Sequence, residues 1–242
     1  MKNFKLTIQY DGTNYSGWQI QENSLTIQQE ITDAIEVILK EKVNLIGSGR
    51  TDAGVHAVGQ TANFKTEKNF DPKKFWYSLN SILPSDISIL KIEEAAVNFN
   101  ARFDAKKRSY LYLISTYKSP FLHPYSFFYS GGVEITALNN LSKLILGKHD
   151  FTSFCKRSGE VENKTCTIDT AYWKETRGFI SFLIEGNRFL HGMVRTVVGT
   201  LLNAQKNNLG KEYISGIINS RERSSASEAV PAKGLFLYKV KY

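Results

Sequence analysis

The stretch Gly49–Ala57 reads GRTDAGVHA, within a longer glycine-rich segment, LIGSGRTDAGVHAVGQ, at Leu45–Gln60. Asp52 is the single acid of that segment, with Arg50 two residues before it and His56 four residues after it. A lone carboxylate beside a cation indicates either a turn that the aspartate caps or a site that the aspartate serves. Motifs elsewhere in the chain favour the second interpretation, a site that the aspartate serves.

Two common phosphate-binding loops do not match this segment. It lacks the Lys-Ser/Thr ending of a P-loop, and Asp52 occupies the place of the last glycine in a G-x-G-x-x-G pattern. The glycines at 47, 49, 54 and 59 still permit backbone conformations that are closed to other residues. A nucleotide-binding loop is therefore disfavoured, whereas a structural turn in which Asp52 pairs with Arg50 remains open.

The composition is that of an ordered globular protein of one or two domains. Of the 242 residues, 42% are hydrophobic and 12% aromatic, and there are 5 prolines. No apolar run approaches the roughly 20 residues that a membrane span needs. The opening residues, MKNFKLTIQYDG, lack the apolar core of a signal peptide. We therefore expect a cytoplasmic protein without a membrane partner.

The charge balance favours a polyanionic partner. The chain has 31 basic and 23 acidic residues, a formal net charge of +8. Residues 101–118, ARFDAKKRSYLYLISTYK, carry five basic side chains against one acid, with three tyrosines and a phenylalanine among them. Basic side chains with aromatic faces suit unstacked bases, although an ordinary strand preceded by an exposed charged segment would show the same pattern. The candidate phosphate contacts are Arg102, Lys106, Lys107 and Arg108.

The sulfur and imidazole side chains predict no metal site. Cys155 and Cys166 are the two cysteines, and free thiols are the default for such a pair. His149 lies near them, but the spacing of the three residues is irregular for a zinc site.

The first half of the chain alternates strands and helices. Apolar alternation over residues 4–10 predicts a half-buried strand that ends at the turn pair Asp11-Gly12. Thr26 and Gln29 form a capping box before a helix. Strands are expected at 61–66 and 86–92, and between them Asp71 and Pro72 begin a helix. The apolar face of the first helix comprises Ile27, Ile31, Ala34, Ile35, Ile38 and Leu39.

The second half repeats this order. It predicts strands at 109–115, 167–174, 179–185 and 235–242, and helices at 134–146, 188–204 and 210–219. The apolar side of the 188–204 helix comprises Phe189, Leu190, Met193, Val194, Val197, Val198, Leu201 and Leu202. Mixed elements in both halves predict an α+β fold of two similar domains, residues 1–105 and 106–242, with the boundary within 100–107.

Several stretches in order along the chain resemble the tRNA pseudouridine synthases of the TruA type. GRTDAGVHA is the most specific of them. The others begin at Tyr10, Ala101, His149, Phe189 and Gly234, and read YDGTNYSGWQIQ, ARFDAKKRSYLYLI, HDFTSF, FLHGMVRTVVG and GLFLYKV. The resemblance covers nearly the whole chain. Its one visible departure is Gly192 in His191-Gly192-Met193, where a second histidine is often expected.

The resemblance implies a pseudouridine synthase fold, with antiparallel sheets, packed helices and a catalytic cleft between two α+β domains. It also implies a homodimer that isomerises uridine at positions 38 to 40 in the anticodon stem-loop of tRNA. Breaking the bond from N1 to the ribose and rejoining the sugar through C5 requires no redox change, so we expect neither cofactor nor metal. The target nucleotide must leave its stack to reach a carboxylate.

By this resemblance Asp52 is the catalytic carboxylate and Arg195 its partner, a role that suits the forked guanidinium on the flank of an apolar helix face. Tyr110 is assigned to the target base, by stacking and by proton transfer at C5, whereas periodicity alone makes Tyr110 and Tyr112 core residues. Arg50, as the neighbouring cation, is the second substrate-binding residue. His56 is interpreted as structural or RNA-contacting rather than as a general base.

Two other classes of function remain as alternatives. An RNA-binding module without catalysis would not require Asp52, Tyr110 and Arg195 together. A metal-dependent nuclease would require several clustered acids, whereas the signature loop offers one.

Overall fold

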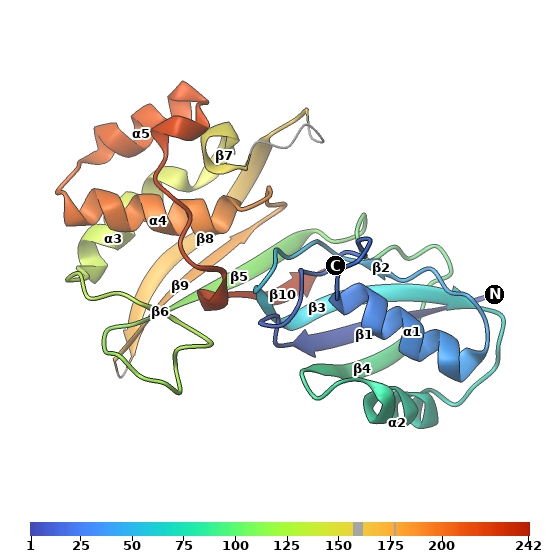
Figure 1. Cartoon of the computed structure of the whole chain (residues 1–242). Helices are drawn as coiled ribbons and strands as arrows, with labels where there is room; N and C mark the ends of the chain where they lie inside the picture. Colours follow the sequence, from blue (N-terminus) through green and yellow to red (C-terminus); the bar gives the residue numbers. More distant parts are fainter. Residues whose placement is uncertain (157–161, 177) are drawn as a thin grey trace. The chain divides into compact units, whose positions relative to one another are not determined.

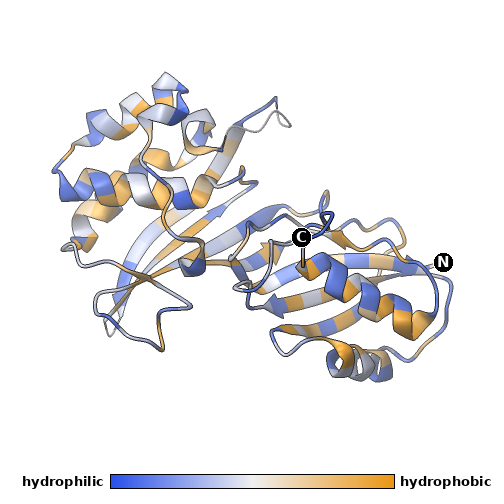
Figure 2. Cartoon of the chain, in the orientation of Figure 1, coloured by the Kyte–Doolittle hydropathy of each residue, from blue (hydrophilic) through white to orange (hydrophobic). Residues whose placement is uncertain are grey.

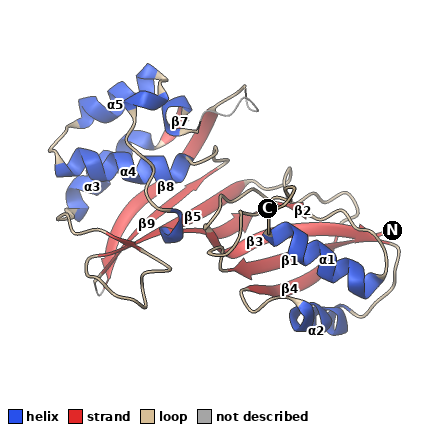
Figure 3. Cartoon of the chain, viewed as in Figure 1, coloured by secondary structure: helices blue, strands red, loops and turns tan. Residues whose placement is uncertain are grey.

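The structure is a computed structural model that describes residues 1–156, 162–176 and 178–242 (Figure 1). The chain divides into two compact units, one of Met1–Lys106 with Phe236–Tyr242 and one of Lys107–Leu235. The C-terminal strand thus groups with the N-terminal unit, whereas the sequence boundaries placed it in 106–242. The division into domains 1–105 and 106–242 stays a prediction. Figure 3 shows strands and helices in both units, which confirms the α+β class.

The N-terminal unit is built on the strand order β4-β1-β3-β10, with β2 paired to β3. Strand β1 runs antiparallel to β3 and to β4, whereas β10 runs parallel to β3 and pairs Phe236 with His56. The sheet is therefore mixed. Its strands are β1 (Lys2–Tyr10), β2 (Ile46–Gly47), β3 (His56–Thr66), β4 (Ile87–Ala95) and β10 (Leu235–Lys241), and its helices are α1 (Ile27–Leu39) and α2 (Pro72–Ile82).

The core of this unit lies between the sheet and its two helices. Phe64 of β3 contacts Phe4 of β1 and Phe75 of α2, with ring centroids 5.8 and 6.0 Å away. Apolar and polar residues alternate along α1 in Figure 2, as they do in a helix that buries one side. The predicted face of α1 is buried except at Ile38, which is half-buried.

The predicted helix starts in this unit are confirmed, with one correction. The Thr26 hydroxyl caps α1 by accepting the Gln29 N–H, and the Asp71 carboxylate caps α2. The reciprocal half of the capping box is wrong, because the Gln29 amide donates to Asp33 instead, at 2.6 Å. The i,i+4 spacing of Gln29 and Asp33 offers a side-chain acceptor close by on the helix surface.

The C-terminal unit has the strand order β5-β9-β8-β7, antiparallel throughout, with β6 parallel to β5. Its strands are β5 (Lys107–Ser115), β6 (Phe127–Phe128), β7 (Gly147–Asp150), β8 (Thr165–Thr176) and β9 (Phe179–Gly186), and its α-helices are α3 (Ile135–Ser142), α4 (Met193–Lys206) and α5 (Lys211–Ser220). Short 3₁₀ helices occur at Lys143–Ile145, Thr152–Phe154, Arg223–Ser225 and Ala232–Gly234.

Trp173 of β8 joins the sheet of this unit to α3. Its ring lies 4.6 Å from that of Phe182, and its indole N–H donates to the Ser142 hydroxyl at 2.9 Å. The Asn139 side chain accepts the backbone N–H of Trp173 and donates to its carbonyl oxygen. These bonds satisfy buried polar groups that would otherwise be costly.

The structure corrects two element boundaries and adds the short strands β2, β6 and β7. Helix α4 begins at Met193 rather than 188, because Gly192 takes the left-handed conformation (φ 70°), which ends the regular helix there. Strand β3 begins at His56, so that the last part of the glycine-rich segment is strand rather than loop. Strand β7 was not predicted, because its GKHD sequence has no apolar alternation. None of the helices in the described ranges is long and apolar enough to cross a membrane.

Candidate active site

The Asp52 loop joins β2 to β3 and is fixed at its base by Gln60. The Gln60 side-chain oxygen accepts the Ser48 hydroxyl at 2.6 Å, and its amide N–H donates to the Gly49 carbonyl at 2.9 Å. The Ser48 backbone N–H also donates to Thr61 O at 2.7 Å. Ser48 and Gln60 are buried, so the loop begins from a rigid, fully bonded base.

The tip of the loop is fixed on both sides of Asp52. The Thr51 hydroxyl bonds the Tyr10 hydroxyl at 2.8 Å, and the Thr51 carbonyl accepts the Trp18 N–H at 3.1 Å. The Asp52 carbonyl accepts the Val55 N–H at 3.1 Å, which closes a turn through Gly54 (φ 74°). Asp52 itself is partly exposed. The backbone therefore holds an accessible carboxylate in a defined place.

A neighbouring segment, residues 12–18, packs directly on the loop. A Cβ atom at Gly12 would overlap the Val55 carbonyl oxygen, and one at Gly17 would lie 2.5 Å from Thr51 O. Tyr15 anchors the segment by donating its hydroxyl to Asp86 at 2.6 Å. Burial, followed by the Asp86 carboxylate, raises the pKa of Tyr15 above its usual range, so the hydroxyl stays a donor.

Two glycines of the loop segment allow close packing within the N-terminal unit. A Cβ atom at Gly47 would meet the Trp18 ring, and one at Gly59 would overlap the Tyr238 carbonyl oxygen. Both positions therefore require glycine because other parts of the N-terminal unit pack closely on their backbone.

The close approach at Gly12 predicts a loss of stability on substitution. We expect Gly12→Ala to lower the free energy of unfolding by about 1–3 kcal/mol, because the added Cβ overlaps the Val55 backbone, whose N–H closes the Asp52 turn. Gly216→Ala in α5 is the control, since a Cβ there meets nothing within 4 Å. Its better helix propensity should stabilise by up to about 1 kcal/mol. Urea unfolding measures both, and equal effects of the two changes would contradict the packing argument.

The His56 side chain holds Gly12, the first residue of the 12–18 segment. Its side chain is 1% exposed and stacks on Phe236, with ring centroids 4.7 Å apart. Its Nδ1 atom lies 3.1 Å from the Gly12 N–H nitrogen and 3.0 Å from an Asp11 carboxylate oxygen. A neutral ring accepts from Gly12, whereas a protonated ring donates to Asp11, so either form holds the Asp11-Gly12 turn. Burial fits a structural histidine and not one that contacts RNA directly.

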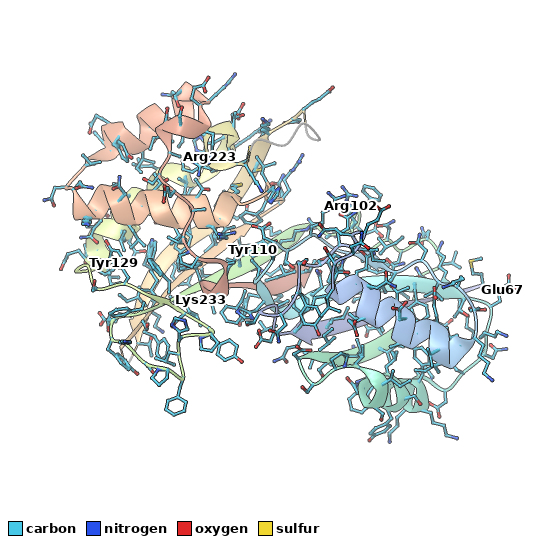
Figure 4. The ribbon with its side chains drawn as sticks, in the orientation of Figure 1. Glu67, Arg102, Tyr110, Tyr129, Arg223 and Lys233 are labelled. Carbon is cyan, nitrogen blue, oxygen red and sulfur yellow. The ribbon has the colours of Figure 1, made fainter. Side chains whose placement is uncertain are left out.

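Tyr110 and Tyr112 lie on the same face of β5, as predicted, but have different surroundings. Tyr110 is 7% exposed and meets the Phe189 ring edge-to-face, with centroids 5.0 Å apart (Figure 4). The Tyr112 hydroxyl donates to the Pro231 carbonyl at 2.9 Å. Burial raises the pKa of Tyr112 well above its usual range, against the opposing charge of nearby Arg195. Tyr112 is therefore a protonated, internally bonded core residue.

Arg195 is half-buried on α4 and is fixed by residues 227–231. Its Nε donates to the Val230 carbonyl at 2.8 Å, and the Val230 N–H donates back to the Arg195 carbonyl at 3.2 Å. Farther along the helix, a Cβ at Gly199 would overlap the Glu228 carbonyl oxygen. The guanidinium thus has a defined direction. Its pairing with Asp52 stays a prediction.

The four candidate RNA-contacting residues occupy different environments. Arg102 is exposed beside the ring of Phe103, 5.5 Å from its centroid, and Lys106 is also exposed. The Lys107 ammonium lies 3.4 Å from the Asp169 carboxylate, and Arg108 donates to the Asn187 carbonyl at 3.1 Å. Lys107 and Arg108 therefore also have structural partners within the C-terminal unit.

The cysteines are free and buried, and burial raises the pKa of Cys166 to about 11. In the part of the chain that the structure describes, no three His, Cys, Asp or Glu side chains are grouped to hold a metal ion.

The sequence analysis did not predict which residues hold Tyr112 and Arg195 in place. Tyr112 and Arg195 bind the consecutive carbonyls of Pro231 and Val230, although no local pattern connects these positions. Gly12 gave a stronger signal, since it lies in the block YDGTNYSGWQIQ that begins at Tyr10. There the glycine could have been interpreted as a close approach of two backbones.

Comparison with known proteins identifies the family. A family model described as tRNA pseudouridine synthase matches residues 6–104 and 141–242. The tRNA pseudouridine synthase A of Clostridium acetobutylicum is 42% identical over 244 residues, which cover 100% of both chains. The tRNA pseudouridine synthase A of Caldicellulosiruptor saccharolyticus is 41% identical, and the match again covers 100% of both chains. The tRNA pseudouridine synthase A of Brachyspira hyodysenteriae is 42% identical over 98% of this chain and 96% of that one. The chain therefore belongs to the tRNA pseudouridine synthase family.

Proposed function

We propose that this isomerase converts uridine to pseudouridine at positions 38 to 40 in the anticodon stem-loop of tRNA, with Asp52 as the catalytic carboxylate and without a cofactor. We further propose that it acts in the cytoplasm as a homodimer. The observation that carries the catalytic part is the Asp52 loop. A single acid lies in a loop whose residues Ser48 and Thr51 are held by side-chain hydrogen bonds, and the acid remains partly exposed.

The proposed reaction balances without an outside reagent. The bond from the ribose C1′ to uracil N1 breaks, the detached base turns, and a bond forms between C1′ and C5. The C5 proton then leaves, and N1 gains a proton. Asp52 attacks the sugar or the base, or removes a sugar proton, and a preorganised carboxylate suits each of these roles.

Three other side chains have proposed roles beside Asp52. Tyr110 stacks on the target uracil and moves the proton at C5, and Arg50 binds the substrate near the carboxylate. Arg195 supplies a guanidinium whose direction residues 227–231 fix. A binding module without catalysis would retain tRNA affinity in the absence of turnover, and a nuclease would cut the RNA and respond to chelator.

Mapping of pseudouridines in tRNA from cells with and without the protein tests this proposal. We expect pseudouridine at positions 38 to 40 to disappear when the gene is deleted and to return with the wild-type protein. Unchanged modification at all three positions would reject the assignment of these uridines.

Lys106 provides a test of the phosphate contacts. Lys106→Gln should weaken tRNA binding and reduce the slope of log affinity against log salt by about 0.7 to 0.9, because one counterion-releasing contact is lost. Lys106 is a cleaner choice than Lys107, whose neutralisation would leave Asp169 without its partner. Lys73→Gln on α2 removes an equal charge elsewhere and is the control. Identical slopes for the two variants would remove Lys106 from the RNA-binding surface.

A further inference from the structure

A loop outside both stretches matched by the family model presents aromatic side chains to solvent. The family model covers residues 6–104 and 141–242, whereas residues 116–133, TYKSPFLHPYSFFYSGGV, connect β5 to α3. Phe121 is 86% exposed, Tyr117 51% and Phe128 42%. Residues 116–133 are called the aromatic loop below (Figure 1, yellow-green). Clustered exposed aromatic residues are typical of a surface that binds a partner.

The aromatic loop is held in place by hydrogen bonds. Strand β6 lies within it and pairs with the end of β5, and the Tyr129 N–H donates to the Ser115 carbonyl at 3.1 Å. Within the loop, the buried Ser126 hydroxyl donates to Leu122 O at 2.7 Å. Phe121 is therefore presented by a bonded framework, which lowers the entropy cost of binding through its ring.

The charges of this surface are positive. Lys118 is the single charged residue of the aromatic loop. The Lys233 ammonium lies 3.1 Å from Nε2 of His123 and so adds a second positive charge beside the loop (Figure 4). Aromatic faces with neighbouring cations suit RNA, in which bases stack and phosphates attract ammonium groups.

We propose that the aromatic loop binds unpaired nucleotides of the tRNA substrate, with Phe121 stacking on a base and with Lys118 and Lys233 attracting the adjacent phosphates. The proposal rests on tRNA being the substrate and extends its binding surface. Single-stranded RNA segments offer the unstacked bases that such a surface requires.

A second copy of the chain fits this surface less well. A two-fold interface places the same patch on both sides. A patch that carries Lys118 and Lys233 would then face a second patch of the same positive charge, and the aromatic loop itself contains no acid. RNA phosphates, in contrast, carry the opposite charge to both ammonium groups.

Phe121→Ala is the direct test, because an 86% exposed side chain contributes little to folding. We expect the Kd for an unmodified tRNA transcript to rise by about 5- to 100-fold, the loss of one stacked base. The kcat/KM for the transcript should fall with the weaker binding. Tyr77→Ala on α2 removes another exposed aromatic ring, 56% exposed, and should leave the Kd unchanged. An unaltered Kd for Phe121→Ala would overturn the proposal.

Two further measurements separate the alternatives. A tryptophan introduced by Phe121→Trp should retain binding, and its fluorescence should be quenched by tRNA, whereas Tyr77→Trp should respond little. Sedimentation velocity should show the same oligomeric state for wild type and Phe121→Ala. A change of oligomeric state would instead assign the surface to a second copy and overturn the proposal.

If the wild type bound tRNA through Phe121 but formed no pseudouridine, the proposed function would fail while this surface remained.

Discussion

Asp52→Asn should abolish pseudouridine formation and leave tRNA binding intact. The change keeps the size of the side chain and its ability to cap a turn, but removes the charge. If Asp52 is the catalytic carboxylate, turnover should fall by about 10³-fold or more, while affinity, which comes from distributed phosphate and stacking contacts, should persist. Single-turnover assays and tRNA binding measure the two quantities separately.

The interpretation of Asp52 as a turn residue makes the opposite prediction. The turn already has backbone bonds through Thr51, Asp52 and Val55, so asparagine should serve in it almost as well. Activity near that of the wild type, in a variant with unchanged urea midpoint, would support the structural role. If Asp52→Asn lost both stability and activity, Asp52→Glu would be the second variant to assay, because it retains the carboxylate and extends it by one methylene group.

Tyr110→Phe should slow turnover with little loss of binding. General acid-base catalysis contributes about 10²- to 10⁴-fold, so removal of a hydroxyl that moves a proton should cost a comparable factor. The phenyl ring keeps the edge-to-face contact with Phe189. Tyr110→Ala should lose that contact too, and should also weaken tRNA binding by the roughly 1–3 kcal/mol of a stacked base.

Tyr172→Phe on β8 is the control for this series, because it removes a partly exposed hydroxyl from another strand of the same unit. We expect wild-type rates for it. Wild-type turnover by Tyr110→Phe as well would limit Tyr110 to a stacking role, and the proton at C5 would need another acceptor.

Local patterns predicted most of the elements but not all their ends. Thr26 and Asp71 marked two helix starts, because capping depends on neighbours within three residues. Phe189 and Leu190 fitted the apolar spacing of α4, yet they precede it because Gly192 is left-handed. A glycine inside a helical pattern was the available signal for that boundary.

The candidate site was predicted less completely, for a physical reason. Asp52 and Tyr110 were proposed from motif and resemblance, whereas the residues that hold them in place are distant in the sequence. The bond from Tyr10 to Thr51, the residue before Asp52, joins positions 41 residues apart, and the ring that meets Tyr110 is Phe189 on a different segment of the chain. Such partners are chosen by tertiary packing, which periodicity in a short window does not encode.

Turnover of a uridine-containing tRNA transcript by the purified protein, followed by mapping of pseudouridine, tests the central claim most directly. The reaction should contain chelator and no added cofactor, with Asp52→Asn assayed in parallel. The account predicts pseudouridine at one or more of positions 38 to 40 with the wild type and none with the variant. Pseudouridine formed by Asp52→Asn at a substantial fraction of the wild-type rate would contradict it.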